Sequence, residues 1–222
     1  MSTTIKICGL NSGAAVRAAA AADFAGFVLY PPSPRNVTAL EAGKLAAKLA
    51  PGVRRVAVMV DPDDATLRAT FERFKPDVLQ LHGSETPARV ANIRAAYGVA
   101  IIKAVPVRAA GDLDAARDFE ACADWLMFDA KPPRLDALPG GNAAAFDWTL
   151  LAGRAWRRPW FLSGGLTPAN VAGAIATTGA PGVDVSSGVE AKPGHKDPTK
   201  ITAFIAAVRR RSVAGTTAAI AR

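Results

Sequence analysis

Two short runs, Phe161-Leu162-Ser163-Gly164-Gly165-Leu166 and Val183-Asp184-Val185-Ser186-Ser187-Gly188-Val189-Glu190, organise the rest of the chain. Each begins as an apolar, strand-like run, ends abruptly in Gly and Ser, and is followed by sequence that can begin a helix. Small residues at such a junction leave backbone N–H groups uncovered, and a helix N-terminus adds positive partial charge. Two such junctions side by side predict a cradle for an anion, of which phosphate is the commonest among small molecules.

Apolar β-rich runs alternate with Ala-rich helical runs along the whole chain. The predicted strands are 5–8, 26–30, 56–60, 78–81, 100–105, 125–129, 160–163 and 183–185. The predicted helices are 13–22, 39–50, one capped at 61–63 and ending near 74, 87–96, 112–121, 148–152, 168–177 and 198–210. Continuous Val, Ile and Leu runs indicate strands buried on both faces, as in a parallel sheet. Eight β-then-α units predict one α/β domain over residues 1–222, a (β/α)8 TIM barrel with a frayed tail at 212–222.

An open, doubly wound sheet is the other arrangement of repeated βα units. No Gly-x-Gly-x-x-Gly follows the first strand, which argues against a dinucleotide-binding open sheet. In a barrel, the carboxyl ends of all strands meet at one rim, where the loops after strands seven and eight frequently hold a phosphate. The two opening runs end strands seven and eight, so a barrel would bring them together.

The composition limits the class of protein. The 222 residues, half of them hydrophobic, suit one domain with a sizeable core, and no apolar run approaches the roughly 20 residues of a membrane span. The N-terminal residues show no apolar signal region, so we expect a cytoplasmic protein without membrane contact. The net charge of +8 fits a solvated basic surface or attraction of an anionic substrate. Dispersed basic residues and only 7% aromatics argue against a nucleic-acid partner.

Cysteine and histidine are scarce. Two Cys and two His are too few for a disulfide framework or a zinc site, so we expect no metal and no cofactor. Cys122, at the end of a predicted helix, is read as a small buried hydrophobe, and His195 as a surface residue. No apolar stripe is left unassigned, and we therefore expect a monomer.

Cys8 and Asp129 end the first and sixth predicted strands and would face the rim. Lys6 lies on the same side of the strand as Cys8, and a nearby cation favours the thiolate over the thiol. Without a His at nucleophile–base spacing, Cys8 suits proton transfer better than acyl transfer. Asp129 follows four apolar residues, and a carboxyl buried among them would favour its protonated form, as a general acid requires. A helix cap or an ion pair with Lys131 is the alternative for Asp129.

Other polar residues stand at the same rim. Arg35 follows Tyr30-Pro31-Pro32-Ser33-Pro34, whose three prolines stiffen the loop. A rigidly held Arg suits bidentate recognition of a carboxylate, with a solvated loop Arg as the alternative. Gln80 and His82 are polar rim groups, and His82 fits a hydrogen-bonding role as well as a catalytic one. Asp184 would orient backbone or substrate hydroxyls, or cap the turn that follows it.

Several segments, in order, carry a resemblance that covers about residues 4–208. They are Ile5-Lys6-Ile7-Cys8-Gly9-Leu10, Gly26-Phe27-Val28-Leu29-Tyr30-Pro31-Pro32-Ser33-Pro34-Arg35, Leu79-Gln80-Leu81-His82-Gly83, Phe146-Asp147-Trp148, Leu162-Ser163-Gly164-Gly165-Leu166-Thr167-Pro168-Ala169-Asn170-Val171, Val183-Asp184-Val185-Ser186-Ser187-Gly188-Val189-Glu190 and Pro193-Gly194-His195-Lys196-Asp197. Any one of them is a weak signal, but the set resembles the phosphoribosylanthranilate isomerases of tryptophan biosynthesis.

The resemblance implies a (β/α)8 barrel that isomerises N-(5′-phosphoribosyl)anthranilate to 1-(2-carboxyphenylamino)-1-deoxyribulose 5-phosphate, without a cofactor. By the family pattern, Cys8 is the general base, Asp129 is the general acid, and Arg35 binds the anthranilate carboxylate. We also expect Gln80, His82 and Asp184 to bind the phosphosugar substrate. The residues that match the family's phosphate site are Gly164, Gly165, Ser186, Ser187 and Gly188.

One departure from the family pattern lies before Phe146-Asp147-Trp148. The family usually has Gly-Gly-Thr/Ser-Gly there, whereas this chain reads Gly140-Gly141-Asn142-Ala143. Because Ala adopts positive φ less freely than Gly, the loop over 131–145 is expected to differ in shape or to close more slowly. The loop also carries extra residues around 134–138, to which no role is assigned.

Two other functions remain as alternatives. Another phosphosugar isomerase or epimerase would keep the phosphate cradle but place carboxylates or a metal at the other strand ends, and Cys8 argues against it. A non-catalytic anion-binding module, suggested only by the charge of +8, would bind in a steeply salt-dependent way and would not depend on Cys8.

Overall fold

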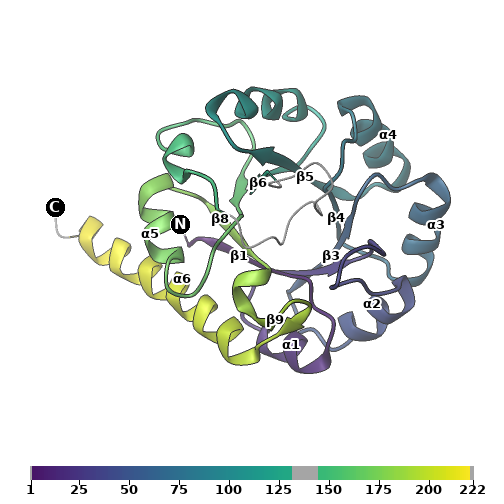
Figure 1. The fold of residues 1–222 in the computed structure, drawn as a ribbon, viewed down its shortest axis with the longest axis horizontal. Coiled ribbons are helices and arrows are strands. Elements are labelled where there is room, and N and C mark those ends of the chain that lie inside the picture. Colours follow the sequence, from purple (N-terminus) through teal and green to yellow (C-terminus); the bar gives the residue numbers. More distant parts are fainter. Residues whose placement is uncertain (1, 132–144, 221–222) are drawn as a thin grey trace.

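A computed structural model describes residues 2–131 and 145–220, with side chains placed up to Arg210. The described residues form a closed barrel of eight parallel strands in sequence order, with β8 paired to β1 (Figure 1). The barrel strands are β1 (Thr4–Cys8), β2 (Phe24–Val28), β3 (Arg54–Met59), β4 (Val78–Leu81), β5 (Ala100–Val107), β6 (Trp125–Ala130), β7 (Trp160–Leu162) and β8 (Gly182–Val185).

Helices surround the barrel, and one short antiparallel hairpin follows the last barrel strand. The α-helices are α1 (Gly13–Ala18), α2 (Ala39–Ala46), α3 (Asp64–Arg73), α4 (Pro87–Tyr97), α5 (Val171–Thr178) and α6 (Pro198–Ile220). The 3-10 helices are η1 (Ala110–Phe119), η2 (Trp148–Leu151) and η3 (Ser187–Val189), and the hairpin pairs β9 (Glu190–Lys192) with β10 (His195–Lys196). None of the helices in this described part is long and apolar enough to cross a membrane.

Local sequence explains where several helices begin and end. Thr38 and Glu41 form a reciprocal capping box at α2, which satisfies two otherwise unpaired backbone N–H groups. Thr86 accepts a hydrogen bond from the backbone of Arg89 at the start of α4. The same helix ends at Gly98, whose φ of 59° lies in the left-handed region that glycine tolerates.

The fold class predicted from the sequence is confirmed, and the differences concern individual elements. Strand β2 begins at Phe24 rather than at 26, and the predicted helix at 112–121 is the 3-10 helix η1. Helix α6 continues to Ile220, past the predicted end at 210, while fraying at 212–222 stays a prediction. The sequence analysis did not predict the β9–β10 hairpin. Tertiary contacts stabilise this hairpin, and the local pattern of hydrophobic residues gives no sign of such contacts.

Two apolar clusters flank the strands. The outer cluster lies between strands and helices, whereas the inner one fills the barrel and includes Val56, Val78 and Ile102. Inside the barrel, the ring of Phe24 contacts those of Trp125 and Phe161, with centroids 5.7 and 5.5 Å away. These rings come from the first residues of β2 and β6 and from β7, so they fill the amino-terminal half of the barrel. The polar side chains that point into the barrel therefore lie in its carboxyl-terminal half.

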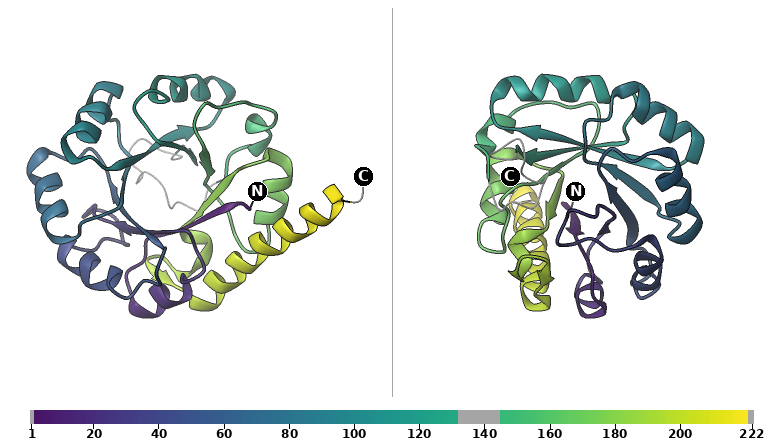
Figure 2. Two further views of the ribbon diagram at one scale, coloured as in Figure 1. Left: turned by 180° about the vertical axis from the view of Figure 1, so that it is seen from behind. Right: turned by 45° about the vertical axis from the view of Figure 1, so that its right-hand side comes forward.

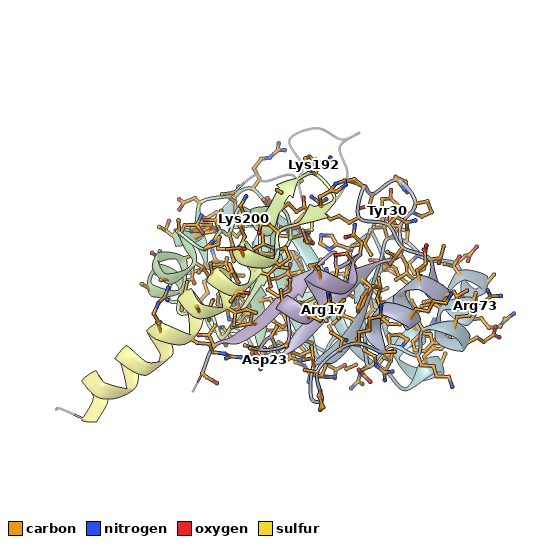
Figure 3. All side chains as sticks on the ribbon, turned by 90° about the horizontal axis from the view of Figure 1, so that it is seen from below. Arg17, Asp23, Tyr30, Arg73, Lys192 and Lys200 are labelled. Carbon is orange, nitrogen blue, oxygen red and sulfur yellow. The ribbon has the colours of Figure 1, made fainter. Side chains whose placement is uncertain are left out.

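The two ends of the barrel are seen from the side in Figure 3. Tyr30, which follows β2, and Lys192 of β9 lie at the upper edge, and Asp23, which precedes β2, lies at the lower edge. The upper edge is therefore the carboxyl-terminal rim. The yellow helix α6 runs along the outside of the barrel between α1 and α5 (Figure 2).

Candidate active site

A pocket opens at the carboxyl-terminal rim of the barrel. It is lined by Cys8, Val28, Tyr30, Ser33, Arg35, Val58, Val60, Gln80, His82, Asp129, Ser163, Asp184 and Ser186. Every residue that the sequence singled out for catalysis or for binding the non-phosphate parts of a substrate is in this set, together with Ser186. Gly164, Gly165, Ser187 and Gly188 are outside it and belong to the neighbouring turns after β7 and β8.

Cys8 lies beside a fully buried ion pair. Lys6 is 0% exposed, and its Nζ donates to Oδ1 of Asp184 at 2.8 Å. Ser163 donates its hydroxyl to the other carboxylate oxygen at 3.2 Å. Burial raises the pKa of the Cys8 thiol, and the Lys6 cation offsets only part of this effect. Lys6 therefore acts in the direction that the sequence predicts, but burial has the larger effect on the sulfur.

Asp129 contacts His82 on the opposite side of the pocket. Its Oδ2 lies 3.1 Å from His82 Nε2, and its Oδ1 accepts the N–H of Ala130 at 2.9 Å. On the far side of the imidazole, His82 Nδ1 lies 2.7 Å from Nε2 of Gln80. Lys131 pairs with Asp112 instead, which removes the alternative of an Asp129–Lys131 ion pair. The three side chains form one hydrogen-bonded row from β4 to β6.

A buried lysine holds the turn that carries His82. Lys103 Nζ donates to the carbonyl oxygens of Leu81 and Gly83, at 3.3 and 2.7 Å. It also donates to Oε2 of Glu85 at 2.7 Å, and Glu85 in turn accepts the N–H of Asp61. With every N–H of the ammonium engaged, this cation fixes the backbone on both sides of His82. The sequence analysis assigned no role to Lys103.

Arg35 is held by a carboxylate that sequence reasoning missed. Its Nε and one terminal nitrogen donate to the two carboxylate oxygens of Glu190, at 2.7 and 2.9 Å. Lys196 donates to the same carboxylate at 2.7 Å and to the backbone carbonyl of Ser186 at 2.9 Å. Burial acts to raise the pKa of Glu190, but the two cations outweigh it and hold that pKa below its ordinary value.

The signal for the pair of Glu190 and Lys196 was present in the sequence. Glu190 and Lys196 flank Pro193-Gly194, and opposite charges on either side of such a turn can pair across a hairpin. Gly194 has a φ of 78°, and a Cβ there would lie 2.5 Å from the carbonyl oxygen of Pro34. The hairpin and the proline-rich loop that carries Arg35 therefore pack directly on each other.

The turns after β7 and β8 also contact each other. Gly164 and Gly165 have φ values of 80° and 71°, a region in which L side chains are strained. Gly188 packs so closely on the carbonyl oxygen of Leu166 that no side chain would fit. Within the described part of the chain, no hydrogen bond engages the N–H groups of Gly164 and Gly165. Their donors suit the anion cradle that the sequence predicts.

The remaining sequence predictions concern residues outside this pocket or outside the described part of the chain. The departure at Ala143 and the extra residues around 134–138 lie outside the described residues. Both cysteines are unpaired and buried, and His195 is exposed on β10. In the ranges 2–131 and 145–210, no three His, Cys, Asp or Glu side chains gather closely enough to hold a metal ion.

Comparisons with known proteins agree over almost the whole chain. A family model described as N-(5′-phosphoribosyl)anthranilate (PRA) isomerase matches residues 5–207. The N-(5′-phosphoribosyl)anthranilate isomerase of Paramagnetospirillum magneticum is 54% identical over 212 residues, which are 94% of this chain and 98% of that protein. The enzyme of the same name from Paracoccus denitrificans is 54% identical over 208 residues, covering 93% and 97% of the two chains.

Solved structures show the same relation. The phosphoribosyl anthranilate isomerase of Thermotoga maritima has a TM-score of 0.81 and 33% identity, over 94% of this chain and 99% of that one. A phosphoribosyl anthranilate isomerase in complex with reduced 1-(o-carboxyphenylamino)-1-deoxyribulose 5-phosphate has a TM-score of 0.78 and 32% identity, over 94% and 99% of the two chains.

Proposed function

The chain belongs to the N-(5′-phosphoribosyl)anthranilate isomerase family, and we propose that its reaction runs between Cys8 as general base and Asp129 as general acid. It isomerises N-(5′-phosphoribosyl)anthranilate in tryptophan biosynthesis. The observation that carries the proposed roles is the placement of Cys8 and Asp129 in one pocket at the rim, on strands β1 and β6. The aldose end of the substrate would lie between them.

The first step opens the ribose ring. The anilino nitrogen of the substrate donates its electron pair toward C1, the bond from C1 to the ring oxygen breaks, and Asp129 gives its proton to that oxygen. The products are a C1 iminium ion and a carboxylate at Asp129. The contact of Oδ2 with His82 supports this role, because it places a hydrogen-bonding group on the oxygen that gains and loses the proton.

The second step removes the proton on C2. The neighbouring iminium acidifies this proton, the Cys8 thiolate takes it, and the C2–H electron pair forms the enolamine, which tautomerises to the ketone. A raised pKa makes the thiolate scarcer but also a stronger base. Lys6 limits that rise, and the iminium of the intermediate adds a second positive charge near the sulfur.

Two binding groups hold the ends of the substrate. The N–H groups after β7 and β8 would take the 5′-phosphate, at Gly164, Gly165, Ser186, Ser187 and Gly188. Arg35, held by Glu190, would read the anthranilate carboxylate. The cluster of Arg35, Lys196 and Glu190 carries two positive charges and one negative charge, so its sum favours an anionic group nearby. Gln80, His82 and Asp184 complete the wall between the two ends.

We further propose a monomeric, cytoplasmic enzyme that acts as a single domain. Among the residues with described side chains, Leu40 is the one large hydrophobic side chain that is exposed, which offers little for a stable interface. The two unpaired cysteines suit a reducing compartment.

The test of the two roles is the loss of phosphoribosylanthranilate fluorescence on adding enzyme. We expect Cys8→Ser and Asp129→Asn each to lower kcat at least about 100-fold, because each proton transfer contributes roughly 10²–10⁴-fold. Cys122→Ser, which changes the other buried cysteine, should retain wild-type kcat. Near-normal turnover by either site variant would remove that residue from its role.

A further inference from the structure

The row from Gln80 through His82 to Asp129 raises the question of where its protons lie. The imidazole contacts Gln80 through Nδ1, at 2.7 Å, and Asp129 through Nε2, at 3.1 Å. A neutral imidazole has one N–H donor and one acceptor nitrogen, and the group bound to one nitrogen determines which role the other plays. Gln80 can therefore influence the proton at Asp129, although the two residues do not touch.

The backbone determines which oxygen of Asp129 carries the acidic proton. Oδ1 accepts the N–H of Ala130 at 2.9 Å, so that oxygen presents a lone pair. In the acid form of Asp129, this contact favours the proton on Oδ2, the oxygen next to His82. To accept this proton in a hydrogen bond, His82 Nε2 must be unprotonated, and the ring hydrogen must then be on Nδ1.

Gln80 can accept or donate at Nδ1. In the structure, its amide nitrogen faces Nδ1 and also lies 3.4 Å from Sδ of Met127, while the amide oxygen, Oε1, is buried with no hydrogen-bond partner. A buried acceptor without a partner is costly. A half-turn of the amide exchanges the two atoms in nearly the same space and points Oε1 at Nδ1. In this orientation Oε1 accepts a hydrogen bond from Nδ1–H and gains the partner that it otherwise lacks.

We propose that Gln80 is a positioning residue that acts through His82. Its amide oxygen accepts a hydrogen bond from Nδ1–H and so keeps the ring hydrogen on Nδ1. Nε2 then accepts a hydrogen bond from the protonated Oδ2 of Asp129 until that proton passes to the substrate. This inference rests on the proposed role of Asp129 as general acid. When the proton leaves Oδ2 for the substrate, the ring hydrogen of His82 can move from Nδ1 to Nε2 by exchange with water. The amide of Gln80 then turns back so that its nitrogen donates to Nδ1, and Nε2–H donates to the carboxylate. The expectation that Gln80 and His82 bind substrate stays a prediction beside this role.

Other charged groups surround this row. Asp61, Glu85 and Lys103 lie around the turn after His82, with the last two paired to each other at 2.7 Å. Across the pocket lie Cys8, Tyr30, Arg35 and Asp184. The variants below leave all of these unchanged, so a shift in pH dependence between them reports the Gln80 contact.

The kinetic test compares Gln80→Met with Gln80→Glu. Met is similar in size to Gln but offers no amide group to hydrogen-bond with Nδ1. We therefore expect kcat at neutral pH to fall at least about tenfold, while KM stays within about twofold of the wild-type value. The midpoint of the basic limb of kcat should move to lower pH. Glu always accepts from Nδ1–H and adds a negative charge beside the imidazole, so that midpoint should move to higher pH, with kcat within a few-fold of wild type.

Three controls distinguish this role of Gln80 from a general effect on folding or on substrate binding. In a His82→Asn background, the difference between the two Gln80 variants should vanish. Thr178→Val, a buried hydroxyl on α5 outside the pocket, should leave the pH profile unchanged. Thermal unfolding of each variant shows whether it is folded. A raised KM with unchanged kcat, or three identical pH profiles, would overturn the inference.

A spectroscopic test needs no substrate. The chain has two histidines, and His195→Gln leaves His82 as the single imidazole in a ¹⁵N spectrum. We expect protonated Nδ1 at the pH of full activity and the Nε2–H form in Gln80→Met. Unprotonated Nδ1 in the otherwise wild-type protein at that pH would contradict the inference. If Asp129→Asn stays active, the general-acid assignment fails; if it is inactive while the Gln80 results are negative, only this inference fails.

Discussion

Cys8 is subject to two opposing influences. Burial raises the pKa of its thiol, and the cation of Lys6, itself fully buried and paired with Asp184, acts against this rise. Lys6 stays charged because Asp184 and Cys8 outweigh the burial that would lower its pKa. Cys8, the proposed base, is therefore a thiol whose thiolate population depends mainly on the Lys6 ammonium group, with a smaller contribution from Lys196.

Removing this ammonium group should make the Cys8 thiolate scarcer. Lys6→Met alone would leave the Asp184 carboxylate buried without its cation, at a cost of about 3–5 kcal/mol, so we use Lys6→Met with Asp184→Asn. The effect of Lys6 on the Cys8 pKa exceeds the opposing effect of Asp184, so that pKa should rise further.

The measurement is the rate of iodoacetamide alkylation of Cys8 as a function of pH, in a Cys122→Ser background so that one thiol reacts. The midpoint should move to higher pH in the double variant. A midpoint that stays in place or moves lower would show that Lys6 does not support the thiolate.

Residues at strand ends were predictable, and the partners of those residues were not. Cys8 and Asp129 each end an apolar run, and the barrel topology sends such ends to one rim. The bond between Arg35 and Glu190 joins residues 155 positions apart, and nothing in the local pattern pairs them. Likewise, the hydrogen bond between Gln80 and His82 depends on side-chain orientations that the sequence does not contain.

At the scale of elements, the β9–β10 hairpin supports the side of the pocket that carries Arg35. Glu190 binds Arg35 and Lys196, and Asn11 donates to the carbonyl of Gly194 at 2.7 Å. Loops after β1, β2 and β8 thus meet at one short hairpin. We expect changes in the hairpin to affect substrate binding more than proton transfer.

Arg35→Met tests the carboxylate-binding role of this region. It removes the bidentate donor while leaving Cys8 and Asp129 in place, so KM should rise and kcat should change less. Arg17→Met, on α1 and outside the pocket lining, is the matched control. An unchanged KM for Arg35→Met would remove Arg35 from the anthranilate site.

The charge of Glu190 should also contribute to stability in a pH-dependent way. Its pKa in the folded protein is below the ordinary value of 4.5, so its contribution is present above that value and is lost as pH falls through the folded pKa. Glu190→Gln should lower Tm at pH 7, and the difference from wild type should shrink as pH falls below 4.5. Glu72→Gln on α3 is the exposed control. A Tm difference that is constant with pH would contradict this linkage.

Element boundaries differ from the prediction where side chains compete with the backbone. The predicted helix at 168–177 begins only at Val171, because Thr167 and Asn170 first form a turn. Asn170 accepts the N–H of Thr167 at 2.7 Å, and Thr167 accepts the N–H of Asn170 at 3.3 Å. Strand β4 matched its prediction of 78–81, and all four of its residues are buried.

For the whole molecule, α6 ties the end of the chain to its beginning. Ile201, Phe204 and Val208 are fully buried, and Arg209 donates to the carbonyl of Thr3 and to Asp23. The barrel closure was predictable from the count of strands, whereas this closing contact was not.

A pair of truncations tests the role of α6. Deleting residues 212–222 should leave Tm and kcat unchanged, because the sequence predicts a frayed tail there. Deleting 201–222 removes buried apolar side chains worth about 1.5–3 kcal/mol each and should abolish the cooperative unfolding transition. A large loss of Tm on the shorter deletion would show that the tail stabilises the barrel.

The central claim is that Cys8 removes the C2 proton that the iminium has acidified. The most direct measurement is the single-turnover fluorescence decay of phosphoribosylanthranilate with hydrogen or deuterium at C2, with wild type and Cys8→Ser. We predict a slower decay with deuterium in the wild type and a loss of at least about 100-fold in Cys8→Ser. A Cys8→Ser decay within a few-fold of wild type, with the same isotope effect, would contradict the account.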